Sequence, residues 1–352
     1  MAKVIDFIAE RLPLNETIGA LKHKQVPVHK RSIFYYLGGI CLYLLVVQIV
    51  TGILLLFYYQ PTEAQAYESV KFIMTKVSFG WLVRSIHAWS ANLMIFALYL
   101  HMFSTFLLKA YRPPRELTWF TGMALLGVCL GLGFTGYLLP WNELAFFATK
   151  VGTEMTRVVP VIGEPLKEFL RGGPTVTGVT LTRFFAFHIW ILPLTLAAIV
   201  GIHLLLVQKL GMSRPLSQQS GPKRSMPFLP HFALRDLNVW LIVLALLLAL
   251  SYYFPAHLGD PANPLAPTPI GILPEWYFLF MFQSLKLFPS HILGMEGEVV
   301  GILTFALGGV FLLLAPFIDR KSAMGQRSPV FTAIGWFVVV FVVAMTIWGR
   351  FG

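Results

Sequence analysis

Residues 84–101 read RSIHAWSANLMIFALYLH, an apolar stretch that begins with an arginine and carries two histidines, His87 and His101, 14 residues apart. A second stretch, RFFAFHIWILPLTLAAIVGIH at 183–203, carries His188 and His203, 15 residues apart. In an α-helix, spacings of this size separate two side chains by about 21–22 Å along the axis and by about 40–60° around it. The sequence therefore predicts two helices that each present one histidine near either surface of a membrane.

The rest of the chain has the composition of a membrane protein. Of its 352 residues, 57% are hydrophobic and only 12% are charged, whereas a soluble domain has about 25% charged residues. A helix needs about 20 apolar residues to cross the hydrocarbon core. Seven stretches meet this need: 33–57, 82–108, 118–139, 182–207, 238–255, 298–318 and 329–349. We predict an all-α fold of seven transmembrane helices, with a four-helix bundle in a first domain (1–210) and three further helices in a second (211–352).

Basic residues indicate the orientation of these helices. The net charge of +11 does not call for a nucleic-acid partner, because Lys and Arg gather on the cytoplasmic side of membrane proteins. Most of the basic residues fall in segments on the same side as the N-terminus. This bias predicts a cytoplasmic N-terminus and a C-terminus on the outer side.

The four intramembrane histidines form two matched pairs. Because both histidine-bearing helices run from outside to inside, His87 is expected to face His188 near the outer surface, and His101 to face His203 near the inner one. Two opposed imidazoles are the ligands of a six-coordinate heme iron that transfers electrons. A single intramembrane histidine would instead indicate packing or a proton path. Four in matched pairs predict two b hemes, with these histidines as the iron ligands.

Glycines recur at the same spacing as the histidines. Gly38 and Gly52 are 14 residues apart in the first stretch, and Gly122 and Gly136 are 14 apart in the third. A heme edge between helices needs positions without side chains where it meets the backbone. Ordinary helix packing also favours glycine in membranes, so the heme interpretation depends on the histidines.

Two arginines precede the outer histidines. Arg84 lies three residues before His87, and Arg183 lies five residues before His188. Arginine binds carboxylates such as heme propionates through two parallel hydrogen bonds. Anchoring of the helix at the membrane interface explains the two positions equally well.

Five motifs give the chain a resemblance to a known family. They are I-F-Y-Y-L-G-G around Gly38, R-S-I-H-A-W around His87, G-Y-L-L-P-W at 136–141, T-L-T-R-F-F-A-F-H ending at His188, and P-E-W-Y at 274–277. From about residue 26 to the seventh span, the chain resembles cytochrome b of the Rieske/cytochrome b (quinol–cytochrome c reductase) complexes. The 15-residue histidine spacing and the two spans after P-E-W-Y are similar to the chloroplast form, which is split into two chains. The continuous chain here indicates a fused bacterial form.

The resemblance also bears on covalent heme. The split form attaches a third heme through a cysteine just before L-G-G, where this chain has Tyr36. We therefore predict no covalently attached third heme. Cys41 and Cys129 are interpreted as small core residues.

The P-E-W-Y motif is the expected quinol site. Glu275 lies in a Pro-rich loop on the outer side by the predicted topology, between Pro274 and the aromatic pair Trp276 and Tyr277. A carboxylate in partly apolar surroundings has a raised pKa and can accept and pass on a proton. Pro and Glu are also good first-turn residues of a helix, which is the alternative explanation.

The other wall of the quinol site is expected from Gly136, Tyr137, Pro140 and Trp141. The amphipathic stretch 142–170 is expected to lie along the membrane surface.

An inner quinone pocket is expected near His203 and the N-terminal segment. Its candidate residues are His23, His29, Lys209, Arg115 and Asp236. The resemblance implies a bifurcated oxidation, in which one electron of quinol goes to a Rieske iron–sulfur protein and the other crosses the membrane through the two hemes to quinone. It also implies a c-type cytochrome subunit, proton translocation, a homodimer of complexes and a bacterial inner membrane.

Three other classes of membrane protein were weighed. A diheme subunit that anchors a dehydrogenase would need neither P-E-W-Y nor three further spans. A secondary transporter with histidines in a proton path should show an inverted repeat, which the sequence lacks. A structural scaffold would not need paired histidines and paired glycines at one spacing.

Overall fold

The structure, a computed structural model, describes residues 7, 11, 19, 21–216, 224–269 and 271–352. Within this part of the chain, six helical segments are long and apolar enough to cross a membrane: Ser32–Leu56, Gly80–Leu107, Glu116–Leu138, Gly178–Leu210, Phe228–Tyr253 and Pro329–Phe351. A shorter apolar helix, α13 (Gly297–Leu313), stands beside them. The predicted all-α membrane fold is confirmed, and the seven predicted stretches correspond to these six segments and α13.

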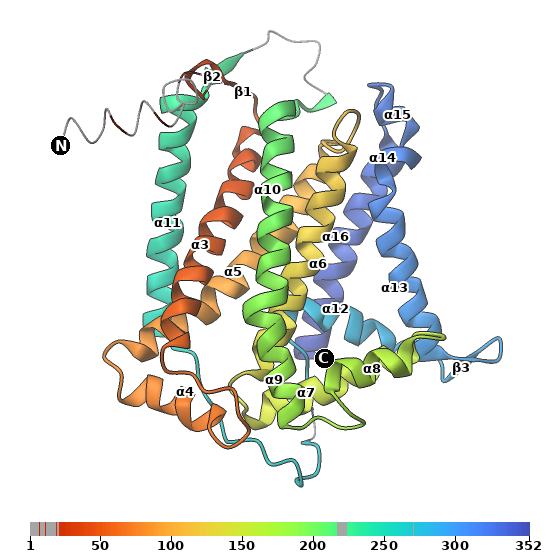
Figure 1. The fold of residues 1–352 in the computed structure, drawn as a ribbon. Helices are drawn as coiled ribbons and strands as arrows, with labels where there is room; N and C mark the ends of the chain where they lie inside the picture. The colour runs from red at the N-terminus through yellow and green to blue at the C-terminus, as the bar shows by residue number, and fades with distance from the viewer. Residues whose placement is uncertain (1–6, 8–10, 12–18, 20, 217–223, 270) are drawn as a thin grey trace.

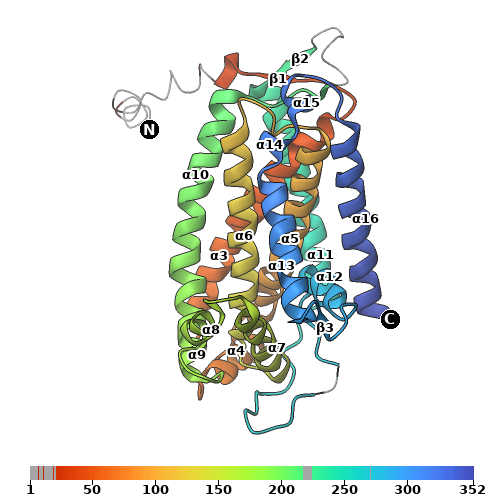
Figure 2. The same cartoon turned by 90° about the vertical axis from the view of Figure 1, so that its right-hand side faces the viewer.

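Four of the long segments form the histidine-bearing bundle. α3 (Tyr36–Leu56) packs along α5 (Gly80–Leu107), and α6 (Glu116–Leu138) packs along α10 (Leu192–Leu210). Figures 1 and 2 show these helices side by side, with α11 (Ala233–Tyr253) against α3 and α5. A cluster of buried side chains fills the middle of the bundle: Leu44, Met94, Leu125, Cys129, Leu196 and Leu247. Cys129 is thus the core residue that was predicted.

The C-terminal helices pack against the other side of α5 and α6. α16 (Pro329–Phe351) contacts α5 and the short helix α12 (Trp276–Leu285), and α13 contacts α12 and α6. The predicted span 298–318 is broken at Leu314, where α13 ends and α14 (Ala315–Ile318) begins. Pro316 has no N–H to donate to the carbonyl of Leu312, and the indole of Trp119 donates to that oxygen instead, at 3.0 Å.

Short elements cover the two ends of the bundle. One end carries α4 (Ala66–Thr75), α7 (Glu143–Glu154), η2 (Met155–Val158), α8 (Gly163–Arg171) and α9 (Gly178–Ala186). Because P-E-W-Y lies there too, we name it the P-E-W-Y end. The opposite end carries η1 (Ser32–Tyr35), η5 (Phe228–Phe232), α15 (Arg320–Ala323) and the antiparallel pair β1 (Gln25–Pro27) and β2 (Ser225–Pro227). Arg112, Arg115 and Arg214 lie there, so we name it the basic end.

The P-E-W-Y end has its own core. Trp141 is 3% exposed and packs edge-on against Phe146, in a cluster with Phe147, Leu181 and Phe184. Trp141 is therefore part of this core. The neighbouring β3 (His291–Ile292) and β4 (Met295–Glu296) form a two-residue hairpin before α13.

Candidate functional site

Each of the four predicted histidines lies against one of the four predicted glycines. A Cβ atom placed on Gly38 would lie 3.5 Å from Cε1 of His101, and one on Gly122 would lie 3.4 Å from Cε1 of His203. The corresponding distances are 3.3 Å from Gly52 to His87 and 2.5 Å from Gly136 to His188. The sequence predicted both sets of residues, and the structure pairs them one to one.

The two histidines at the P-E-W-Y end face each other. The ring centroids of His87 and His188 are 6.3 Å apart, with the ring planes inclined by 73°. A metal–imidazole bond is about 2 Å long, so an iron between two rings holds their nitrogens about 4 Å apart and their centroids somewhat further. The observed separation suits such an ion. Glycine at 52 and 136 leaves each ring edge free of side chains.

The unequal histidine spacings are explained by a π-helical turn. His188 lies in η3 (Phe187–Ile191), the π turn between α9 and α10. One extra residue per π turn means that 15 residues advance the helix about as far as 14 residues of regular α-helix. His188 and His203 therefore keep nearly the same angular relation as His87 and His101. Pro193 follows the turn as the second residue of α10, and without an N–H it cannot continue a regular ladder behind it.

Three predicted arginines already bind backbone oxygens: Arg84 and Arg183, expected at heme propionates, and Arg115, expected at the inner quinone pocket. Arg84 donates to the carbonyl of Ala256 at 2.6 Å and of His257 at 3.2 Å. Arg183 donates to the carbonyl of Phe169. Arg115 donates to the carbonyl of Leu210 at 2.9 Å and joins the start of α6 to the end of α10. These bonds give all three arginines a structural role in addition to the predicted one.

Glu275 is a half-buried carboxylate at the start of α12. Its side chain makes no hydrogen bond or ion pair with any residue that the structure describes. Burial raises the pKa of Glu275 above the ordinary glutamate value. The phenols of Tyr137 and Tyr277 lie within electrostatic range of it. Glu275 begins the helix without capping it, so the helix-start explanation accounts only for its position in the chain.

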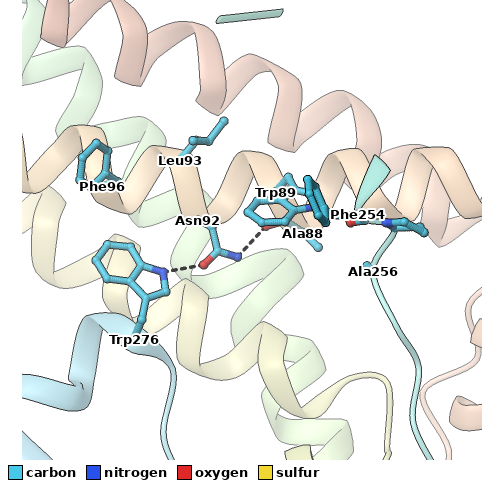
Figure 3. A pocket seen from close by; sticks show the side chains of 9 residues that line it. Ala88, Trp89, Asn92, Leu93, Phe96, Phe254, Ala256 and Trp276 are labelled. Atoms are coloured by element: carbon cyan, nitrogen blue, oxygen red, sulfur yellow. Dashed lines mark hydrogen bonds between the residues drawn. The ribbon is translucent and has the colours of Figure 1, made fainter. Parts of the chain in front are cut away.

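The aromatic residues of P-E-W-Y fix its backbone on two helices. Trp276 donates from its indole to Oδ1 of Asn92 on α5, at 2.7 Å, and Figure 3 shows the two side chains pointing toward one another. Tyr277 is 5% exposed and its hydroxyl lies against Gly133 of α6. Trp276 and Asn92 border a cavity of about 690 Å³ between α5 and the end of α11. Asn92 was missed in the sequence, where a lone amide five residues after His87 gave no signal.

The candidates for an inner quinone pocket lie at the basic end but are only partly brought together. His29 accepts from the N–H of Arg31 through Nδ1 at 3.1 Å, so Nε2 carries the proton that it donates to Tyr35, at 2.7 Å. Burial, together with the nearby charges of Arg214 and Arg31, lowers the pKa of His29 below the ordinary value.

The remaining candidates differ in exposure. Asp236 of α11 packs against Gly39, next to the glycine that contacts His101, and its Oδ1 is buried without a hydrogen bond among the described residues. His23 and Lys209 are exposed.

A buried polar cluster at the basic end joins the bundle to the C-terminal helices. Tyr111, which is 1% exposed, donates to Oδ2 of Asp319 at 2.7 Å. Burial raises the pKa of Asp319, but hydrogen bonds from Ser328, Tyr111 and Ser322 outweigh it and leave that pKa below the ordinary value. The sequence gave no sign of this cluster because its members are 208 residues apart.

The fold and the site define a class of protein: a helical membrane bundle in which four glycines each lie against a histidine, and two of these histidines face each other. Two family models match the chain, Cytochrome b/b6/petB over residues 21–211 and Cytochrome b(C-terminal)/b6/petD over residues 261–351.

Sequence and structural relatives agree with these matches. The chain is 52% identical over 335 residues to the "Cytochrome bc complex cytochrome b subunit" of Chlorobaculum thiosulfatiphilum, covering 95% of this chain and 77% of the relative. It is 36% identical over 346 residues to "Cytochrome b" of Rhodobacter capsulatus, covering 91% and 79%. A solved chain of "Hyperthermophilic respiratory Complex III" matches with a TM-score of 0.87 and 32% identity over 99% of this chain and 91% of that one.

The chain therefore belongs to the cytochrome b/b6 family and is a cytochrome b subunit of a bc-type quinol–cytochrome c oxidoreductase complex. Membership of this family implies heme b binding and an integral membrane protein.

Proposed function

We propose that this chain oxidises quinol at the P-E-W-Y end and carries electrons across the membrane to a quinone site at the basic end, through two b hemes. His87 with His188, and His101 with His203, hold the two irons. The observation that carries the proposal is the one-to-one contact of each histidine with a glycine. The hemes, when bound, supply the acceptance and release of single electrons.

The chain's own contribution at the P-E-W-Y end is to accept protons. Quinol oxidation releases two protons and two electrons. Glu275 is a carboxylate that binds no side chain in the described part of the chain, and its raised pKa suits it to accept and release a proton. Trp276 and Tyr277 position it by binding Asn92 and packing on Gly133. Pro274 precedes it and fixes the backbone direction at the start of α12.

The other members of the proposed assembly follow from the family. A Rieske iron–sulfur protein takes one electron from quinol and passes it to a c-type cytochrome subunit. Hemes held by the four histidines would accept the second electron. The complex is a homodimer in a bacterial inner membrane, with the basic end in the cytoplasm and the P-E-W-Y end outside, and it translocates protons. The excess of Lys and Arg at the basic end supports this orientation. Tyr36, in place of a cysteine, supports the absence of a covalent third heme.

The experiment is a comparison of two glutamate variants in the purified complex. Glu275→Gln removes the proton acceptor and keeps the shape, so quinol-dependent reduction of heme b should slow while both heme spectra stay intact. Glu68→Gln is the matched control, because Glu68 is exposed on α4 at the same end and pairs with the neighbouring Lys71. Benzoquinol and naphthoquinol analogues serve as substrates. Turnover that is equal in the two variants would sink the assignment of Glu275.

A further inference from the structure

Three of the four histidines share a hydrogen-bond partner of one type. Nδ1 of His87 lies 2.9 Å from the hydroxyl oxygen of Thr51, and Nδ1 of His203 lies 2.9 Å from that of Thr121. Nδ1 of His188 lies 3.4 Å from the hydroxyl oxygen of Thr135. Each threonine directly precedes the glycine that contacts the same histidine, so one T-G dipeptide supplies both the space and the polar contact.

The direction of these hydrogen bonds follows from the second contact of each hydroxyl. Every one of the three donates its proton to the carbonyl four residues earlier in its own helix, at 2.7 Å for Thr51, 2.9 Å for Thr121 and 2.8 Å for Thr135. The hydroxyl oxygen is then left as an acceptor, so Nδ1 of the histidine carries the hydrogen. Nε2 consequently keeps its lone pair free, which is the tautomer that binds iron through Nε2.

A carbonyl oxygen shows independently that Nδ1 of His188 carries the hydrogen. The carbonyl of Leu132 lies 3.1 Å from Nδ1 of His188. Because a carbonyl can only accept, Nδ1 of His188 must donate. The tautomer at this position is therefore set by two acceptors, the carbonyl and the more distant Thr135 hydroxyl.

His101 is the exception. The residue before its glycine is Leu37, which has no hydrogen-bonding group, and Nδ1 of His101 is buried without a hydrogen-bond partner among the described residues. The pair at the P-E-W-Y end thus has a threonine behind both histidines. The pair at the basic end has one behind His203 only.

We propose that Thr51, Thr121 and Thr135 are positioning residues that set the reduction potentials of the two hemes, and that Leu37 makes the heme at the basic end the easier one to reduce. This inference rests on the proposed function, because it requires a heme at each histidine pair. A histidine that donates from Nδ1 is a more basic ligand. A more basic ligand stabilises the oxidised iron and lowers its potential.

The asymmetry gives electron transfer a direction. At the P-E-W-Y end, both histidines that hold the iron donate from Nδ1 to a threonine hydroxyl. At the basic end, His203 does so and His101 does not. A heme held at the P-E-W-Y end would therefore be the stronger reductant of the two. Threonine or leucine before the glycine, at equivalent helical positions, is the main difference between the two pairs.

The test is a potentiometric measurement of both heme potentials in the purified complex. Thr51→Val removes the hydroxyl with little change of shape. It should raise the midpoint potential of the heme at the P-E-W-Y end, which His87 holds. We expect about a threefold to tenfold change in the one-electron reduction equilibrium, which corresponds to about 28 to 59 mV. Thr51→Ser keeps the hydroxyl and should leave both potentials near those of the wild type.

Two further variants make the assignment internally consistent. Thr135→Val should raise the same midpoint as Thr51→Val, and by less, because its hydroxyl is more distant and Leu132 also accepts from His188. Leu37→Thr should lower the other midpoint, because it adds the missing acceptor behind His101. This last variant changes a different histidine contact from the valine variants, so it stays informative even where one of them fails to assemble.

A pyridine hemochrome assay on every variant separates the two proposals. Two b hemes per chain with potentials that do not move in Thr51→Val and Leu37→Thr would overturn this inference and leave the proposed function intact. If Leu37→Thr raised the midpoint potential of the heme at the basic end, that result would also overturn the inference. Fewer than two hemes in the wild-type chain would instead remove the proposed function.

Discussion

Replacing Gly136 with alanine tests how closely a histidine and a glycine are fitted in this bundle. The added Cβ would lie 2.5 Å from Cε1 and 3.0 Å from Nδ1 of His188. The closest ordinary contact between carbon atoms is about 3.5 Å, so the imidazole must withdraw by about 1 Å. A metal–imidazole bond of about 2 Å cannot follow a shift of half its own length. We expect the chain to lose the heme at the P-E-W-Y end and to keep the one at the basic end.

Overpacking of this kind also costs about 1–3 kcal/mol of stability, so the assay must separate heme loss from unfolding. The measurement is the heme content per chain and the reduced-minus-oxidised spectrum of protein that elutes as a single species. Gly127→Ala is the control on the same helix, because a Cβ there would meet nothing within 4 Å. If Gly136→Ala retained two hemes with an unchanged spectrum, the claim that His188 requires a glycine at position 136 would be refuted.

Three more expectations can be measured on the same preparations. Because the pKa of Glu275 is raised and only its ionised form accepts a proton, quinol oxidation should rise with pH through that pKa, and Glu275→Gln should lose this dependence in a pH–rate profile. Deleting Trp190 from the π turn should leave two hemes. Deleting Ala197 from regular helix should instead rotate His203 by about 100° and remove the heme at the basic end. The heme content of each variant measures this. Tyr111→Phe should lower stability by about 1.5–3 kcal/mol at neutral pH, and by less under acid conditions. The lowered pKa of Asp319 stabilises the fold when the pH is above the pKa of this group in the unfolded chain, and that stability is lost as the pH falls through its pKa in the folded chain. Thermal unfolding at two pH values measures both losses, and an equal loss at both would contradict the role of the charge.

The helical framework and the positions of the four intramembrane histidines could be predicted because their signals are local and periodic. The apolar stretches are read directly as spans, and the spacing of His87 and His101 places both on nearly one face of a helix. The glycines were predicted from the same repeat, yet their individual partners came only from the structure. The sequence shows that Gly52 and His87 recur with others at one interval, and the packing of α3 on α5 decides that these two touch.

The features that sequence reasoning missed depend on contacts between distant segments. The 15-residue spacing on the fourth span was taken as a family trait, and its physical cause, the π turn at His188, requires backbone hydrogen bonding that no residue pattern specifies. The break after α13 was missed although Pro316 was visible, because a proline in a membrane helix does not always end it. Trp119 completes that break from another helix, 193 residues away.

The threonines were within reach of the sequence. Three of the four glycines are preceded by threonine, and this T-G repeat could have been found together with the histidine spacing. Its meaning could not, because a threonine in a membrane helix usually bonds only to its own backbone. The positions of Arg84 and Arg183 illustrate the reverse case, in which a plausible electrostatic role was predicted and the structure shows bonds to backbone carbonyls as well.

The most direct test of the account is a redox-titrated difference spectrum of the isolated protein together with a pyridine hemochrome assay. Four histidines in two pairs predict two b-type hemes per chain with separate midpoint potentials, and no c-type signal. A chain that bound a single heme, or none, would contradict the assignment of the histidine pairs. A c-type signal on this chain would contradict the interpretation of Tyr36 and of the two free cysteines.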